Sequence, residues 1–284
     1  MKRRFRSTVK LQKARSSVRL SATLVLLCFP ALAQTAAEVK GKKIVDDAIQ
    51  ALGGQKFLTM EDRTEHGRAF SYYRDQISGL DIASIYTRYI TVAPDRTGVD
   101  VAQREREAFG KDEDSFVLFT EKGGWSVTYH GAHEMEPDQL ARYKETTLRN
   151  IFYILRVRLN EPGMVFESRG SDVVENQPAD LVDITDSDDR IVTVAFNQTT
   201  HLPIRQSYAH VNQLYHDQDQ EVTLFSRYQD SNGIEWPHEI HRERNGDKIY
   251  EMFSDTVKFN TDLTDDLFSV PEPGTASAKK KHKK

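Results

Sequence analysis

The sequence has almost no cysteine. Cys28 is the only one, and it lies in an N-terminal segment that we predict to be removed. Without another thiol, the rest of the chain has no disulfide, no thiolate nucleophile and no cysteine-containing metal site. An exported domain of this kind must be held together by its apolar core, and the chain is long enough to form one as a single β-rich domain.

The apolar run near the N-terminus is too short for a typical membrane span. Residues 20–32 number thirteen and include Pro30, whereas a membrane-spanning helix needs about 20 apolar residues. Eight basic residues and no acidic residue precede the run, and Ala31-Leu32-Ala33 closes it. This pattern is typical of a signal peptide. We predict that residues 1–33 are a signal peptide, with a membrane anchor as the alternative, and that Cys28, preceded by two leucines, is not lipidated.

Positive charge is scarce in the body of the chain. Removing the eight basic residues of 1–33 and the five lysines of the C-terminal tail leaves 26 basic against 43 acidic residues, a net charge of −17. Because nucleic-acid binding needs a basic surface, we expect no nucleic-acid partner. We predict that residues 272–284 form a disordered basic tail. The tail is either simply solvated or a contact for an anionic membrane surface, through Lys279, Lys280, Lys281, Lys283 and Lys284.

Catalytic and cofactor motifs are also missing. The chain has no G-x-G-x-x-G and no G-x-S-x-G, which removes the usual signals for a dinucleotide and for a hydrolase nucleophile. His238 and His241 lie three residues apart in a predicted strand, so their rings should point to opposite faces. His130 and His133 lie in a predicted loop with no third ligand nearby in the sequence. We therefore predict no catalytic residue, metal or cofactor, and no enzyme activity.

Two helices and many strands are expected. Apolar residues recur with a helical period over residues 38–52, before Gly53 and Gly54, and again over residues 137–159. Alternating patterns predict strands near residues 62–73, 82–92, 98–103, 115–120, 164–168, 179–185, 191–197 and 202–208.

The clearest pattern is an antiparallel meander over residues 192–271. Its strands alternate between apolar and polar positions, and Asn232-Gly233 and Asn245-Gly246 mark its tight turns. The apolar positions are either ordinary core or one wall of a part-open pocket for a hydrophobic ligand. The candidate cavity wall consists of Val222, Leu224, Ile234, Trp236, Ile240, Phe253 and Val257.

Several short motifs occur in an order that resembles the LolA/LolB-like superfamily, in particular outer-membrane lipoprotein-sorting-like proteins. They are ALGG at 51–54, GGW at 123–125, THLPIR at 200–205, GIEWP at 233–237 and the closing segment 260–271 with DLFSVP. The resemblance implies an α+β, mainly β domain over residues 34–271. Its fold would be a single curved antiparallel sheet, an unclosed β-barrel of about eleven strands, with helices packed on the concave face. It also implies a periplasmic, non-enzymatic carrier of lipid or lipoprotein acyl chains.

Three functions remain open at this stage. The first is a periplasmic binding protein or carrier for lipid-like ligands. The second is an envelope-sensing or protein-interaction module on the same scaffold, which predicts a fully packed interior. The third is an exported hydrolase that uses histidine, with His130 or His238, and carboxylates.

Overall fold

The computed structural model describes residues 34–91, 101–211 and 218–271. Its helices are α1 (Ala36–Ala51), α2 (Gln55–Leu58), α3 (Pro137–Leu148), α4 (Ile151–Tyr153), the π-helical η1 (Ile154–Arg158) and the 3-10 helix η2 (Asp265–Phe268). Its strands are β1 (Asp62–Tyr73), β2 (Gln76–Tyr89), β3 (Gln103–Phe109), β4 (Ser115–Thr120), β5 (Gly123–Thr128), β6 (Gly131–Glu134), β7 (Val165–Val174), β8 (Gln177–Thr185), β9 (Ile191–Asn197), β10 (Pro203–Val211), β11 (Gln218–Ser231), β12 (Ile234–Arg244) and β13 (Asp247–Phe259).

Two predicted segments lie outside the described residues. These are the signal peptide, residues 1–33, and the basic tail, residues 272–284, with its membrane-contacting lysines. Both stay predictions. Within the described residues, no helix has the length and apolar character needed to cross a membrane.

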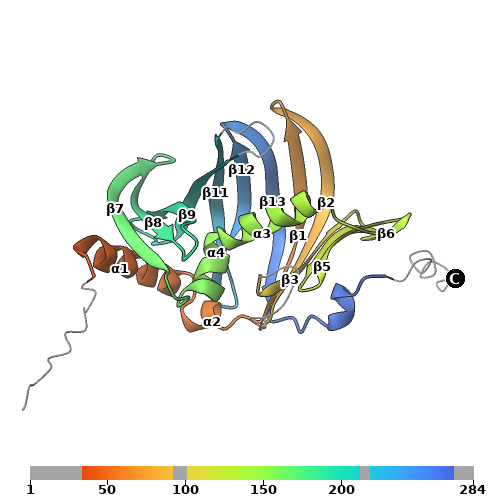
Figure 1. The fold of residues 1–284 in the computed structure, drawn as a ribbon, viewed down its shortest axis with the longest axis horizontal. Helices are drawn as coiled ribbons and strands as arrows, with labels where there is room; N and C mark the ends of the chain where they lie inside the picture. The colour runs from red at the N-terminus through yellow and green to blue at the C-terminus, as the bar shows by residue number, and fades with distance from the viewer. Residues whose placement is uncertain (1–33, 92–100, 212–217, 272–284) are drawn as a thin grey trace, which may run out of the picture. The chain divides into compact units, whose positions relative to one another are not determined.

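All thirteen strands form one antiparallel sheet in the order β6-β5-β4-β3-β2-β1-β13-β12-β11-β10-β9-β8-β7. The chain forms two meanders, and pairing of β1 with β13 joins them in the middle (Figure 1). The edge strands β6 and β7 do not pair with one another, so the barrel is unclosed. The predicted α+β, mainly β class and open sheet are confirmed, with thirteen strands instead of about eleven.

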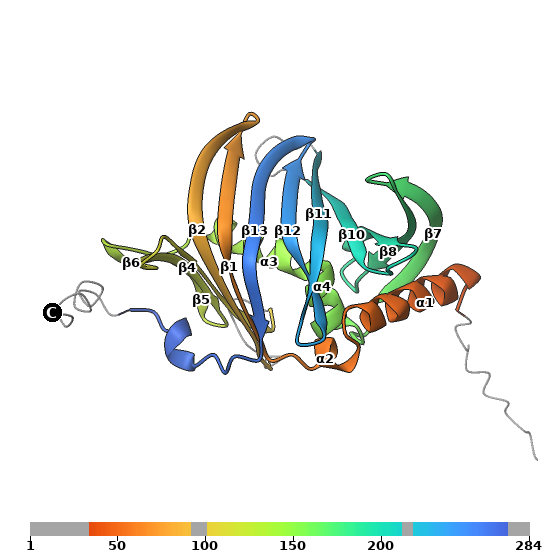
Figure 2. The same ribbon diagram turned by 180° about the vertical axis from the view of Figure 1, so that it is seen from behind.

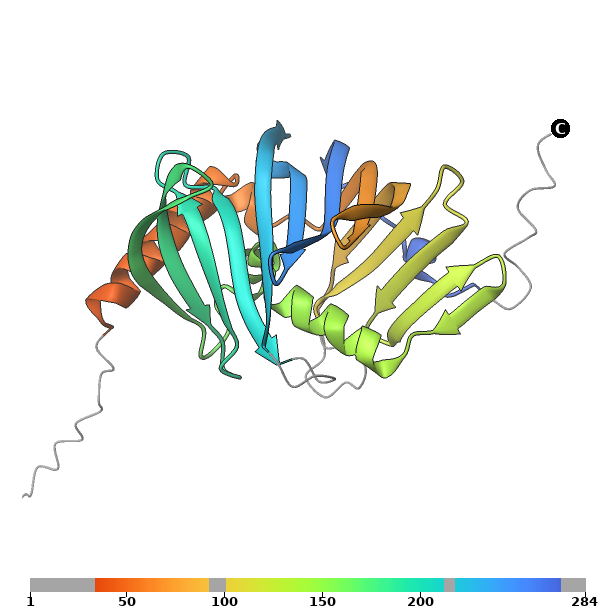
Figure 3. The same ribbon diagram turned by 90° about the horizontal axis from the view of Figure 1, so that it is seen from above.

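The helical segment between β6 and β7 crosses the sheet. These two strands are the opposite edges, so the connection must pass over one face. Figures 1 and 2 place α3 and α4 on that face, and Figure 3 shows α3 running from the side of β5 and β6 toward β10 and β11. The sheet face under this segment is concave, as expected for a curled antiparallel sheet with helices inside.

The predicted helix over residues 137–159 is interrupted. Helix α3 ends at Leu148, and the Asn150 side chain accepts hydrogen bonds from the backbone N–H groups of Phe152 and Tyr153. An asparagine that caps a new helix competes with continuation of the previous one. The break therefore starts a second helical piece, α4 with η1.

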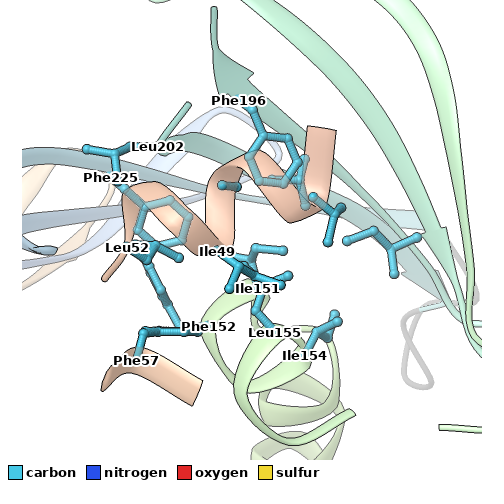
Figure 4. Close-up of a cluster of buried hydrophobic side chains, with 14 of the residues drawn as sticks. Ile49, Leu52, Phe57, Ile151, Phe152, Ile154, Leu155, Phe196, Leu202 and Phe225 are labelled. Atoms are coloured by element: carbon cyan, nitrogen blue, oxygen red, sulfur yellow. The ribbon is translucent and has the colours of Figure 1, made fainter. Parts of the chain in front are cut away.

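The main core lies between the helices and one half of the sheet. Apolar residues of α1, α2, α4 and η1 pack on the inner face of β7 to β13 (Figure 4). Phe152 contacts Phe225 and Trp236, with ring centroids 5.1 and 4.5 Å apart. The helices therefore cover this part of the concave face. On the convex face, η2 brings Phe268 onto a smaller cluster from β3, β4 and β5.

Helix α1 approaches β7 so closely that only glycine fits at the contact. A Cβ atom on Gly41 would lie 2.4 Å from the backbone oxygen of Phe166. Helix propensity alone would make Gly41→Ala stabilising by about 1 kcal/mol. We expect the reverse, a loss of about 1–3 kcal/mol in the free energy of unfolding, because α1 must move off the strand. Urea unfolding measures this, with Lys40→Ala on the exposed side of α1 as the control. An increase in stability for Gly41→Ala would contradict the close contact.

Candidate ligand-binding site

A cavity of about 460 Å³ lies between the concave face of the sheet and the helical segment. Its lining comes from β1, β2 and β3 on one side, β11, β12 and β13 on the other, and α3 and α4 above. This volume lies in the roughly 300–1,000 Å³ range of ligand pockets. The helices thus cover one end of the concave face and leave a hollow beside it, between β1–β3 and β11–β13.

The wall formed by β11, β12 and β13 is largely apolar. Phe225, Trp236, Ile240 and Met252 line it, and Phe152 of α4 adjoins them. Strand pairing places Phe225 opposite Ile240, and Ile240 opposite Met252, on one face of the sheet. Because Ile240 is only half-buried, this wall keeps apolar surface available to a ligand.

The wall formed by β1, β2 and β3 is polar, and hydrogen bonds link it to β13. Ser254 Oγ donates to Glu65 Oε1, and Arg63 Nε lies 3.5 Å from Glu65 Oε2. Arg63 also donates to Thr87 Oγ1 over 3.1 Å. Thr87 Oγ1 in turn donates to Glu105 Oε2 over 3.0 Å. These bonds satisfy charged groups that would be costly to bury alone.

The polar wall also holds α3 in place. Gln103 Nε2 donates to the Tyr143 hydroxyl over 3.0 Å. The Tyr143 ring stacks on Phe119 of β4, with 3.5 Å between the centroids. Tyr143 therefore attaches α3 to the sheet at the border of the cavity.

Two carboxyl groups on β3 face the cavity in an environment that disfavours their charge. Glu105 and Glu107 are both half-buried and lie two residues apart, so they share a face of the strand. Burial raises the pKa of Glu105. Burial, and then repulsion from Glu105, raises the pKa of Glu107 to about 7, although Arg242 and Arg63 act in the opposite direction. Glu107 can therefore change protonation near neutral pH.

Only two of the seven predicted wall residues line the cavity, namely Trp236 and Ile240. Ile234 and Val257 are buried in the main core. Val222, Leu224 and Phe253 lie on the opposite, convex face, because the register pairs Leu224 with His241 and Phe253 with Glu239, each next to a cavity-facing pair. The assignment of these three to the concave wall is corrected by the register. A role in ligand binding stays a prediction for Trp236 and Ile240.

The structure adds polar cavity residues that the sequence reasoning missed. The predicted strand at residues 98–103 is instead β3, Gln103–Phe109, within the described part of the chain. Its acidic residues Glu105 and Glu107 face the cavity, while Arg104 and Arg106 alternate with them. This period-two alternation of acidic and basic residues was the available signal for a strand.

His238 and His241 lie on opposite faces of β12, as predicted, whereas His133, predicted to lie in a loop, lies in β6. His238 is buried, and its Nδ1 lies 2.8 Å from the Ser254 carbonyl oxygen. His241 contacts Glu251 and Glu243 on the other face. Within residues 34–91, 101–211 and 218–271, no group of three or more histidine, cysteine or acidic side chains is placed to hold a metal ion.

A second hollow, of about 630 Å³, borders η1 and the turn after it. Its charged groups are already paired. Arg158 contacts Glu161 and Asp186, and Arg190 contacts Asp188.

The cavity under α3 differs because some of its charged groups lack such partners. Among the described residues, no hydrogen bond and no ion pair within 4 Å reaches Glu107, Arg142 or Arg242.

No protein-family model matches the sequence, and no curated protein matches it significantly. Solved structures do match. A DUF1329 family protein from Desulfovibrio piger superimposes with a TM-score of 0.56 and 12% identity, over 81% of this chain and 97% of that one. An outer-membrane lipoprotein-sorting protein domain from Vibrio parahaemolyticus has a TM-score of 0.52 and 11% identity, over 82% and 97%.

The chain has a LolA-like fold. The resemblance read from the short motifs is therefore confirmed at the level of fold. A LolA superfamily protein from Nitrosomonas europaea also matches, with a TM-score of 0.48 and 10% identity over 81% of this chain and 97% of that one. At such identities the LolA-like fold is shared, and the ligand has to be argued from the cavity itself.

Proposed function

We propose that this protein is a periplasmic, non-enzymatic binding protein or carrier for a lipid-like ligand, held in the cavity between the sheet and α3. The observation that carries the proposal is the cavity of about 460 Å³ with an apolar wall on β11, β12 and β13. Burial of an acyl chain against such a wall is favourable by about 0.8 kcal/mol per CH₂ group. The LolA-like fold, shared with a lipoprotein-sorting domain, supports the same reading.

The two alternative functions fit the described residues less well. An interaction module alone predicts a fully packed interior, whereas the concave face contains a cavity. A hydrolase built on His130 or His238 needs one of them beside a nucleophile. His130 is exposed in the turn between β5 and β6, while His238 is buried on β12 against a backbone carbonyl.

Lipid extraction tests the proposal directly. The processed protein, purified from a periplasmic extract without detergent, is expected to carry lipid that mass spectrometry detects in a near-stoichiometric amount. The same protein should bind a neutral hydrophobic dye such as N-phenylnaphthylamine and release it when lipid is added. Lipid-free protein that also takes up neither dye nor lipid would exclude the proposal.

Two matched variants locate the site. Ile240 and Leu224 are both half-buried aliphatic residues on neighbouring strands, but only Ile240 faces the cavity. Ile240→Arg places a cation against the apolar wall, so we expect dye affinity to fall tenfold or more, about 1.4 kcal/mol or more. Leu224→Arg changes the convex face and should leave affinity within about twofold, less than 0.5 kcal/mol. Equal losses in fluorescence titrations of the two folded variants would place the ligand elsewhere.

A further inference from the structure

Two side chains of opposite charge line the cavity from opposite walls. Glu107 projects from β3 and Arg242 from β12, and β2, β1 and β13 separate their strands in the sheet. Among the described residues, no hydrogen bond and no ion pair within 4 Å reaches either group. Arg142 of α3 also lines the cavity without such a partner, but it is exposed to solvent. Glu105, Arg63 and Glu65 differ, because each has a hydrogen-bond or ion-pair partner in the wall.

The residues around Glu107 and around Arg242 indicate which ligand group could pair with each side chain. Glu107 interacts electrostatically with Glu105 on its own strand, Glu65 and Arg63 on β1, Arg242 on β12, Tyr250 on β13 and Tyr143 on α3. Arg63 and Arg242 offset part of this negative charge, but the three carboxyl groups on this side still make it a favourable place for a cation. Arg242 lies next to Tyr250 and Thr223 in the register, two residues along β12 from Ile240 and on the same face. An anion beside Arg242 would therefore sit at the end of the apolar wall.

A buried hydrogen-bond donor without an acceptor also lines this cavity. Trp236 lines the same cavity and is 1% exposed, and its indole N–H has no acceptor among the described residues. A buried donor without an acceptor is uncommon and usually has a reason. The lining of the cavity thus holds more hydrogen-bonding and charged groups than its own residues pair.

We propose that the ligand is an amphiphile with a zwitterionic headgroup, whose ammonium group contacts Glu107 and whose anionic group contacts Arg242, with its acyl chain along Ile240 and Phe225. The inference rests on the proposed function and specifies its ligand. An anionic amphiphile pairs with Arg242 but leaves the carboxyl groups of β3 without a cation. A neutral amphiphile leaves both charged groups without a partner and shields these half-buried groups from water, which is costly.

The test compares three amphiphiles with the same acyl chain. Lysophosphatidylethanolamine is zwitterionic, lysophosphatidylglycerol is anionic and monoacylglycerol is neutral. Each is titrated at pH 8, below its micelle concentration, into processed protein freed of co-purified lipid, and calorimetry reports the affinity. We expect the zwitterionic lipid to bind at least tenfold more tightly than either of the others.

Variants separate the two contacts. Glu107→Gln should weaken binding of the zwitterionic lipid about tenfold and leave that of the anionic lipid unchanged or tighter. Arg242→Gln should weaken both. Glu239→Gln, on the convex face of β12 opposite Phe253 in the register, is the matched control and should alter neither. Circular dichroism verifies that each variant is folded.

A pH titration of the unaltered protein keeps the test independent of any variant. A carboxylate pairs with an ammonium group only when it is ionised, and the pKa of Glu107 is about 7. Affinity for the zwitterionic lipid should therefore rise between pH 6 and pH 8, and Glu107→Gln should flatten this dependence. Equal affinities for the three lipids with no effect of Glu107→Gln would overturn the headgroup assignment and leave the proposed function standing. Failure of all three lipids to bind would overturn both.

Discussion

Replacing Asp186 by alanine is expected to lower the free energy of unfolding by about 3 kcal/mol, because buried Arg158 then keeps only Glu161 as a carboxylate partner. Arg158 of η1 is 6% exposed, and its Nη2 donates to Asp186 over 2.8 Å. Burial by itself would raise the pKa of Asp186, but hydrogen bonds from Arg158 and from the turn lower it, so the carboxylate is charged at neutral pH. Urea unfolding at pH 7 measures the effect.

The neighbouring turn offers a control. Asp188 also contacts Arg190, but its side chain is 66% exposed, so Asp188→Ala should cost no more than about 1 kcal/mol. The Arg158–Asp186 pair joins the helical segment to the turn between β8 and β9, while Tyr143 joins it to β3. If both aspartate variants lost the same small amount of stability, this ion pair would not anchor the segment.

Lowering the pH should remove a second large contribution to the free energy of unfolding, that of Glu251 on the convex face. Burial raises its pKa, but hydrogen bonds from Lys248, Tyr72 and His241 outweigh burial and lower the pKa from 4.5 to about 2. A carboxyl group whose pKa is lower in the folded state stabilises the protein above its unfolded pKa. That stability is lost as the pH falls from about 5 toward 2, by about 3 kcal/mol in all.

Glu251→Gln is the variant that isolates this contribution. It should be less stable than the unaltered protein at pH 7, and the difference should shrink steadily as unfolding is measured at pH 5, 4 and 3. Asp255→Asn changes an exposed carboxylate on the same strand and should leave the pH dependence as it was. A constant difference between Glu251→Gln and the unaltered protein across this range would rule out the linkage.

The bounds of several helices and strands could be predicted from local sequence patterns. The Thr35 capping box and Gly53 bound α1 close to the predicted residues 38–52. The strands predicted at residues 62–73, 115–120 and 191–197 have the observed bounds. In each case the chemistry that sets the element is local, either a cap, a turn or an alternation of period two. Strand β3 was missed because five of its seven residues are charged or amide-bearing, which removes the apolar half of the alternation.

The residues that line the cavity were harder to predict from the sequence than the helices and strands. Trp236 and Ile240 were identified as wall residues, whereas Glu105, Glu107 and Arg242 were not. Alternation separates the residues of a strand into two sets, but β11 has apolar residues in both, Leu224 in one and Phe225 in the other. Which set lies inside depends on the helical segment that crosses one face and on the register with β12.

The sequence by itself determined the local elements and their two-faced character, because caps, turns and alternation act between residues close along the chain. The order of its short motifs also predicted a LolA-like fold, and solved structures with that fold superimpose on the chain. Only the tertiary structure decided which face of the sheet is concave and which charged side chains meet across the hollow. These follow from contacts between distant segments, such as the pairing of β1 with β13, that no local pattern encodes.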